Sequence, residues 1–452
     1  MKRRWIGLML SAVMTVSLLT GCGKDSTPQE EVKQNAEENN AGETTEKKGK
    51  ITYVAQGGGA DWDKYTMELI PQFEAETGIE VEVEFYSQSE LFQLIEVKMS
   101  NKSDEFDVIA VDAPMVAGYA DKGYLVPMDN YFSEEEKAKF TDSAMEAGSW
   151  QGSFYAPAKD SSSQALFYNK ALLDEAGITV PEADPNNRIT WEELFDMAKQ
   201  VQEAVDPDGT KGISGMMFEQ VSTVYQMLAL PNSLGEKSIG DDGYTVDGII
   251  NSDGWVKSMT YYHDMFDQGI APRGMTPEET LDSFAAGKIA FFVGGTWVTS
   301  YMSDDFEWGF TYHPCWEGYE DQIATPTGSW HVAVSSYSQN QEAAAEFVKW
   351  FTIGEGSKKW FDLVEDVPAT VDLVEEFATN EKYQEFPSNI QQFAAYESEN
   401  TAFPRPITPG YATYESIMNA AMEDIRNGAD PKTTLDMAVE QLNSAFQSQK
   451  SE

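Results

Sequence analysis

The order of strand and helix patterns after residue 50 restricts the fold more than any other feature of this chain. Residues 51–55 and 106–111 are short runs typical of strands, and residues 79–85 alternate apolar and acidic side chains, as a half-exposed strand does. Between these runs, apolar residues recur at helical spacing around Phe73 and Leu94. This alternation predicts a parallel sheet whose ligand-contacting loops lie at the carboxyl ends of the strands.

The mixture of helices and strands continues to the end of the chain. Thr190 and Glu193 form the sequence pattern of a capping box, which predicts a helix over residues 190–205. The same pattern recurs at Thr276, where proline follows at the first helical position. The remaining predicted elements are strands over 288–293 and 330–335, a helix over 341–352, and two helices from residue 411 onward, the second beginning at Asp430.

The amino-terminal end carries a targeting pattern. A basic cluster at residues 2–4 precedes an apolar run over 5–19, which is too short for a typical membrane span and predicts a signal peptide over residues 1–21. The run ends in Leu-Thr-Gly-Cys, which resembles a bacterial lipobox, so we expect cleavage before Cys22 and lipidation of its thiol. The alternative is an ordinary signal peptide with a cysteine there by chance. Residues 22–49 contain no aromatic side chain and predict a flexible tether.

The charge and cysteine content exclude several classes of protein. A formal net charge of −45 excludes nucleic acid as a partner, because phosphates demand basic patches, and it disfavours an anionic ligand. The acidic residues are scattered, which is typical of a soluble surface. Roughly four hundred residues follow the tether, enough for two lobes. With Cys22 acylated, Cys315 has no cysteine partner, and we expect a buried free thiol there.

The chain lacks the motifs of common catalytic and metal sites. Its three histidines, His263, His313 and His331, form no His-Glu-x-x-His pattern, and no Gly-x-Ser-x-Gly elbow or phosphate-binding loop occurs. A carboxylate pair for glycoside hydrolysis is left open, but 76 acidic residues make such pairs uninformative. We therefore predict no enzyme activity, no metal and no cofactor.

Aromatic side chains gather near turns and strand ends, where ligand-contacting loops are expected. A sugar ring presents a flat patch of C–H groups that packs on an aromatic face, and its hydroxyl rim needs planar hydrogen-bonding partners. Core packing is the alternative role of each ring. Rings beside polar side chains favour a sugar site, and the candidates are Trp62, Gln88, Asp112, Asp160, Trp297, Trp330, Arg405 and Tyr411.

A set of short segments carries a resemblance to one known family. The segments are 73–81, 106–112, 155–157 with 167–173, 287–297 and 328–330. In this order and at these separations they resemble the ABC-importer solute-binding proteins, the family that contains the maltose-binding proteins. The resemblance covers most of the chain from Lys50 to Phe446.

The resemblance implies an α/β fold with two periplasmic-binding-protein-like lobes, joined by hinge crossings, and a ligand cleft between them. The N-terminal lobe is expected over residues 50–157 and 319–352, and the C-terminal lobe over 158–314 and 353–452. Lobe closure around the ligand is expected to precede docking on the membrane permease subunits of the importer. We expect a monomer that lipidated Cys22 anchors outside the cytoplasm, at the bacterial cell membrane.

Matching the family's motifs residue by residue implies the first ligand contacts. Asp112 matches a sugar-contacting carboxylate after the third strand, and Asp160 lies close to the family's hinge acid. Trp297 matches a stacking tryptophan. Trp330 matches the aromatic residue of a Gly-Gly-Trp-like element, with serine here in place of the second glycine.

The remaining contacts and the ligand follow less directly. Arg405 and Tyr411 match an element that approaches the cleft in some members, whereas Trp62 and Gln88 are expected from loop position alone. The expected ligand is a sugar or oligosaccharide. A polyamine, peptide or metal chelate on the same fold is the second hypothesis, although no histidine cluster supports a metal. A surface glycosidase is the third.

Overall fold

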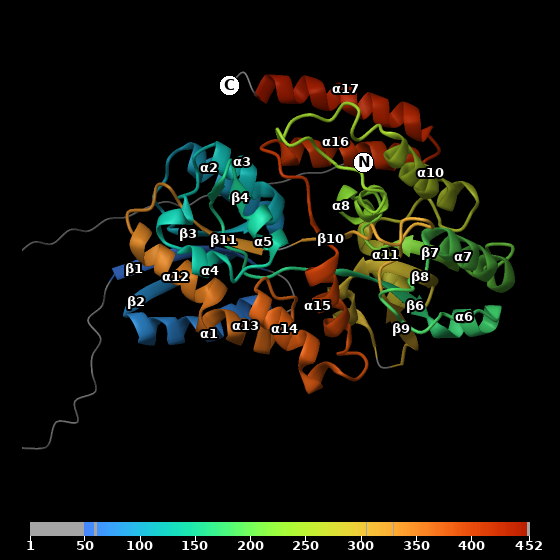
Figure 1. Cartoon of the computed structure of the whole chain (residues 1–452), viewed down its shortest axis with the longest axis horizontal. Coiled ribbons are helices and arrows are strands. Elements are labelled where there is room, and N and C mark those ends of the chain that lie inside the picture. Colours follow the sequence, from blue (N-terminus) through green and yellow to red (C-terminus); the bar gives the residue numbers. More distant parts are fainter. Residues whose placement is uncertain (1–48, 58–60, 304, 329, 450–452) are drawn as a thin grey trace, which may run out of the picture. The chain divides into compact units, whose positions relative to one another are not determined.

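The computed structural model describes residues 49–57, 61–303, 305–328 and 330–449 (Figure 1). The predicted signal peptide, Cys22 and nearly all of the tether lie outside these ranges. Within them, two four-stranded sheets each have their own buried apolar cluster, which confirms the predicted two-lobed α/β fold. No helix in the described ranges is long and apolar enough to span a bilayer.

The N-terminal sheet consists of β1 (Gly49–Gln56), β2 (Ile79–Tyr86), β3 (Val108–Asp112) and β11 (Trp330–Val334), in the order β11–β3–β1–β2. β1 pairs in parallel with β2 and β3, as the sequence predicts, whereas β11 runs antiparallel to β3. The parallel strands are connected by α1 (Trp62–Thr77) and α2 (Gln88–Ser100). Gly78, with a φ of 77°, ends α1 in the left-handed conformation that glycine adopts most easily.

Further helices complete the N-terminal core. They are η1 (Ala113–Met115), α3 (Val116–Asp121), η2 (Met128–Asn130), α4 (Glu134–Lys137), α5 (Asp142–Ala147), α12 (Gln341–Ile353), α13 (Glu355–Val364), α14 (Val371–Thr379) and η4 (Glu381–Tyr383), with a hairpin of β4 (Ser149–Trp150) and β5 (Ser153–Phe154). Trp360 of α13 and Phe377 of α14 are buried in the same cluster as Phe73. Residues from 353 onward were expected in the C-terminal lobe. Instead, α13 and α14 bury their apolar faces in the N-terminal core, and only the last helices, from residue 411 onward, belong to the C-terminal lobe.

The C-terminal sheet consists of β6 (Gln164–Asn169), β7 (Ser214–Phe218), β8 (Ile289–Gly295) and β9 (Trp308–Thr311), in the order β7–β8–β6–β9. Only the β7–β8 pair is parallel. Every residue of β7 and β8 is buried, because helices cover both faces of the sheet.

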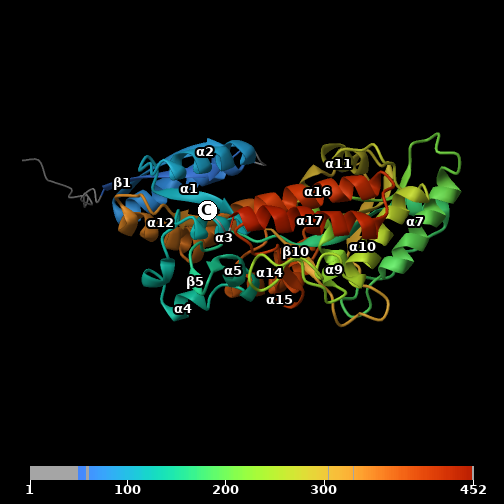
Figure 2. The same cartoon turned by 90° about the horizontal axis from the view of Figure 1, so that it is seen from above.

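Further helices complete the C-terminal lobe. They are α6 (Lys170–Ala176), α7 (Trp191–Val205), α8 (Val224–Met227), α9 (Ala229–Asn232), α10 (Asp253–Asp267), α11 (Pro277–Ala285), η3 (Thr296–Tyr301), α16 (Tyr411–Arg426) and α17 (Pro431–Gln449). The predicted capping boxes at Thr190 and Thr276 are both present. α16 and α17 lie side by side in both views (Figures 1 and 2).

Several segments connect the two lobes. β10 (Thr325–Thr327) pairs in parallel with β12 (Ala402–Pro404). α15 (Ile390–Asn400) contributes Ile390 to the C-terminal cluster and Ala395 to the N-terminal cluster. Residues 158–161 form bridges to His331 and Val367. The connecting segments therefore pack against one another instead of running as free linkers.

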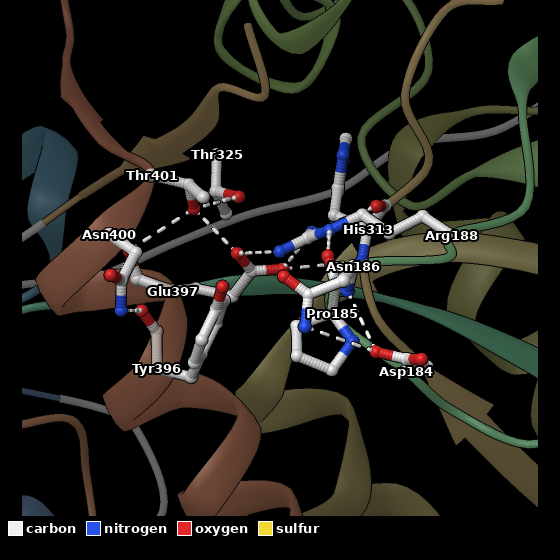
Figure 3. A network of polar contacts seen from close by, with 10 residues as sticks. All are labelled: Asp184, Pro185, Asn186, Arg188, His313, Thr325, Tyr396, Glu397, Asn400 and Thr401. Carbon is white, nitrogen blue, oxygen red and sulfur yellow. Dashed lines mark hydrogen bonds and ion pairs between the residues drawn. The ribbon is translucent and has the colours of Figure 1, made fainter. Parts of the chain in front are cut away.

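A buried polar network fastens α15 to the C-terminal lobe (Figure 3). Arg188 donates from Nη1 and Nη2 to the two carboxylate oxygens of Glu397, at 2.6 and 2.9 Å. Oγ1 of Thr401, the residue after α15, lies 2.9 Å from Oγ1 of Thr325 in β10. The network thus joins α15, β10 and the loop before α7.

Candidate ligand-binding site

Polar and aromatic side chains follow the strand ends of both sheets. In the N-terminal sheet, Asp112 at the end of β3 lies opposite Trp330 at the start of β11. In the C-terminal sheet, Gln164 at the start of β6 lies opposite Gly295 at the end of β8, and Glu219 directly follows β7. Each sheet register therefore brings residues from distant segments to one edge, where ligand-contacting groups of α/β folds lie.

Asp112 and Arg405 form a buried, two-point ion pair. Arg405 donates from Nη1 to Oδ2 at 3.1 Å and from Nη2 to Oδ1, and both side chains are 10% exposed. Burial alone lowers the pKa of Arg405, but the Asp112 carboxylate raises it overall, so the guanidinium stays charged. The guanidinium carbon lies 5.0 Å from the ring centre of Tyr225 and 5.9 Å from that of Tyr411. The predicted contacts Asp112, Arg405 and Tyr411 are thus brought together.

Asp160 lies in a second charged group, beside two tryptophans. Its Oδ1 accepts the backbone N–H of Trp330 at 2.8 Å, and its Oδ2 lies 2.8 Å from Nζ of Lys159. The same ammonium lies 3.6 Å from the ring centre of Trp360 and 4.9 Å from that of Trp62. The Lys159 ammonium therefore lies between Asp160 and Trp62, and Asp160 also contacts the backbone of Trp330.

Trp297 is the predicted stacking residue of the C-terminal lobe. It is partly exposed at the start of η3, and its indole Nε1–H donates to Oε1 of Glu219 at 2.7 Å. Burial raises the pKa of Glu219 to about 7, although hydrogen bonds from Gly295, Trp297 and Gln226 lower it. The C-terminal lobe thus presents the Trp297 ring, which a hydrogen bond to the buried Glu219 carboxyl group keeps in place.

Tyr225 connects the polar groups of the two lobes. Its hydroxyl lies 3.1 Å from Oγ of Ser162, and Ser162 Oγ accepts the N–H of Gly328 at 2.6 Å. Burial raises the pKa of Tyr225, so its hydroxyl stays neutral. Sequence reasoning missed Tyr225, Glu219 and Lys159. Glu219 and Tyr225 come after β7. The rule that ligand-contacting residues follow strand ends, which predicted Asp112 after β3, would have found both of them after β7.

Other predicted residues have different surroundings. Gln88 is exposed at the start of α2. Tyr411 is buried, and its hydroxyl donates to Glu415 at 3.0 Å, so it supports Arg405 from within the lobe. His331 is fully buried with Nδ1 2.6 Å from the carbonyl oxygen of Ala156, and burial lowers its pKa to about 4. Cys315 is buried with a free thiol, as expected.

A cavity of about 780 Å³ borders the crossing at residues 403–407. Residues 145–146, 149–152 and 235–241 also line it, and of the predicted site residues it reaches Arg405. A second space, lined by Arg405 together with Ala113 and Ser161, measures only about 10 Å³. In this conformation the polar groups around Asp112 therefore contact one another closely. Among the described residues, no group of three or more His, Cys, Asp or Glu side chains is placed to hold a metal ion.

Comparison with known proteins places this fold in a family. The family model of the bacterial extracellular solute-binding proteins matches residues 56–352, more than half of the chain. The chain belongs to this family. A galactooligosaccharide-binding protein of Bacillus subtilis is 24% identical over 348 residues, which cover 74% of this solute-binding protein and 75% of the relative. Relatives from Brucella abortus are 24% identical over 245 residues, so the match spans 56% of their length.

Solved structures of the family share the fold. An ABC substrate-binding protein from Listeria monocytogenes, in complex with cycloalternan, superposes with a TM-score of 0.74 at 23% identity. The superposition covers 88% of this solute-binding protein and 99% of the Listeria chain. The two-lobed architecture is therefore that of known solute-binding proteins.

Proposed function

We propose that this protein captures a neutral sugar or oligosaccharide outside the cytoplasm and delivers it to the permease of an ABC importer. The observation that carries the proposal is the pairing of charges at the site. Asp112 is matched by Arg405 and Asp160 by Lys159, beside the partly exposed rings of Trp297 and Trp330. Paired charges present hydrogen-bond donors and acceptors without net charge, which suits hydroxyl groups.

The same pairing argues against a cationic ligand. A polyamine needs carboxylates whose charge is free to bind an ammonium group. Asp112 and Asp160 already have cationic partners, and both oxygens of Glu219 accept N–H groups of the protein. Burial raises the pKa of Glu415, which favours its neutral form. Comparison with other proteins also supports a sugar ligand, through the galactooligosaccharide-binding relative and the cycloalternan complex. We infer that the protein binds this sugar without converting it.

The amino-terminal pattern extends the proposal to the membrane. A signal peptide over residues 1–21 and lipidation at Cys22 would hold a monomeric binding protein at the cell surface, near the permease. Mass spectrometry of protein extracted from membranes is expected to show a lipid on Cys22. Substitution of Cys22 by serine is expected to release the protein into the medium, and retention at the membrane would contradict the anchor.

Thermal unfolding with a ligand panel tests the ligand class. The panel contains maltotriose, a galactooligosaccharide, mannitol, spermidine and a tripeptide. A ligand at one hundred times its Kd stabilises the folded state by roughly 2.7 kcal/mol, which raises the melting midpoint. We expect a rise with a sugar and a smaller rise in Trp297→Ala, with Tyr301→Ala as the control for loss of an exposed ring on the same helical turn. A rise with spermidine or the peptide alone would overturn the sugar proposal.

A further inference from the structure

The Trp297 indole lies flat against the backbone of the turn that carries it. A Cβ atom built on Gly295 would lie 2.1, 2.2 and 2.2 Å from three atoms of the six-membered ring. Nearly equal distances to three ring atoms mean that the ring turns its face, not its edge, toward Gly295. Only glycine leaves this space open. One face of the indole is therefore covered by backbone, and the side chain is still partly exposed.

Glu219 holds this arrangement from the end of β7. Its Oε1 accepts the indole N–H of Trp297 at 2.7 Å, and its Oε2 accepts the backbone N–H of Gly295 at 2.9 Å. A third donor, Nε2 of Gln226, lies 3.3 Å from Oε2. The carboxyl group thus bridges the ring and the backbone on which the ring lies, and it is itself 6% exposed.

The chemistry of the bridge requires a carboxylate. Both oxygens act as acceptors toward N–H groups that cannot reverse their role. A glutamine at this position would turn its NH2 group toward either the indole N–H or the Gly295 N–H, and one of these buried donors would lose its acceptor. Such a loss is expensive in a buried site.

We propose that Glu219 is a positioning residue whose carboxylate holds the Trp297 indole against Gly295, so that the opposite face of the ring is presented to a sugar. The inference rests on the proposed sugar-binding function. A ring that is already oriented loses less conformational entropy when the sugar stacks on it. The stacking surface is therefore a unit of three residues from two strand ends, and not one tryptophan.

The surroundings of Glu219 make the bridge sensitive to pH. A protonated carboxyl group donates one hydrogen and can no longer accept from all three N–H groups. Burial raises the pKa of Glu219 to about 7. The charge of Glu219 acts on Tyr225, whose pKa is raised mainly by burial. Tyr225 in turn contacts Arg405, which stays charged. Neither of them titrates near pH 7, so a change there reports on Glu219.

Indole NMR of the ligand-free protein tests the positioning. Protein labelled with ¹⁵N-tryptophan is titrated from pH 5 to 9, and the Trp297 signal is assigned with Trp297→Phe. We expect this signal to shift with a midpoint near pH 7. In Glu219→Gln the shift is expected to vanish and the indole N–H to exchange faster with solvent. A Trp297 signal that is independent of pH in the wild-type protein would overturn the proposal, and this arm needs no variant that folds poorly.

Calorimetry with maltotriose and a galactotriose tests the consequence for binding. We expect Glu219→Gln and Trp297→Ala each to weaken binding about tenfold, and the double variant to be little weaker than either. Tyr301→Ala removes an exposed ring from the same 3-10 helix without touching the bridge and serves as the matched control. Unchanged affinity in Glu219→Gln would refute the positioning role while the sugar function stands. A pH-dependent indole signal with no binding of either sugar would refute the sugar function while the bridge stands.

Discussion

Removal of Arg188 tests how strongly the buried network fastens α15 to the C-terminal lobe. The side chains of Arg188 and Glu397 are 1% and 2% exposed, and two hydrogen bonds of 2.6 and 2.9 Å join them. Arg188→Met keeps an apolar stem of similar length but removes the guanidinium. Glu397 then keeps the Thr401 hydroxyl, at 2.5 Å, and a long contact from the His313 N–H, at 3.4 Å. A buried carboxylate is left without a cation.

The expected cost is large because the unpaired charge stays buried. Breaking a buried pair by removing one partner costs about 3–5 kcal/mol. Unfolding entropy of about 2.1 cal/mol/K per residue, over roughly 400 residues, converts this loss to a fall in Tm of about 4–6 °C. Differential scanning calorimetry at pH 7 measures it. Arg188→Met with Glu397→Leu removes both charges, and we expect this double variant to recover most of the loss.

The two variants separate charge burial from simple loss of contacts. If the double variant melts at least as far below the wild-type protein as Arg188→Met does, packing and not the unpaired charge sets the cost. If Arg188→Met alone melts within about 1 °C of the wild-type protein, the network contributes little and the reasoning fails.

Three further predictions concern Glu219, Arg405 and the cap of α7. The folded protein keeps a proton on Glu219 up to about pH 7, whereas the unfolded chain releases it near pH 4.5. The contribution of Glu219 to the free energy of unfolding is therefore full below pH 4.5 and is lost as the pH rises to 7. At about 1.36 kcal/mol per pH unit, the wild-type minus Glu219→Gln difference in unfolding free energy is expected to fall by about 3 kcal/mol across this window, and urea titrations at each pH measure it. Arg405→Met leaves Asp112 unpaired and is expected to lower the unfolding free energy by about 3 kcal/mol and to weaken sugar binding; a stable variant with full affinity would contradict this. Thr190→Ala removes the cap of α7 and is expected to cost about 1 kcal/mol in chemical denaturation, without effect on ligand affinity.

Local patterns explain which parts of the fold were predictable. The alternation in residues 79–85, the capping box at Thr190 and the glycine after α1 each act within a few residues, so sequence spacing reveals them. The packing of α13 and α14 was not predictable in this way. Their apolar faces fit either lobe by pattern alone. Only the packing of α13 against α12 and α1, and of α14 against α15, selects the N-terminal core.

Some residues of the candidate site were predictable from local sequence, and their partners were not. Asp112 and Trp297 were predicted from the ends of strands and from the family resemblance, because a strand end marks the ligand-contacting edge of an α/β sheet. Arg405 joins Asp112 across 293 residues, and Glu219 joins Trp297 across 78 residues. No spacing in the sequence encodes such pairs.

The sequence by itself determined the α/β class, the resemblance to a family of solute-binding proteins and the predicted targeting signal. These depend on periodicity and short motifs, which are properties of neighbouring residues. Tertiary structure alone decided which charges are paired, which rings are covered and which carboxyl groups are buried. Those properties depend on desolvation and on donor–acceptor distances, and folding sets both when it brings the ends of distant strands together.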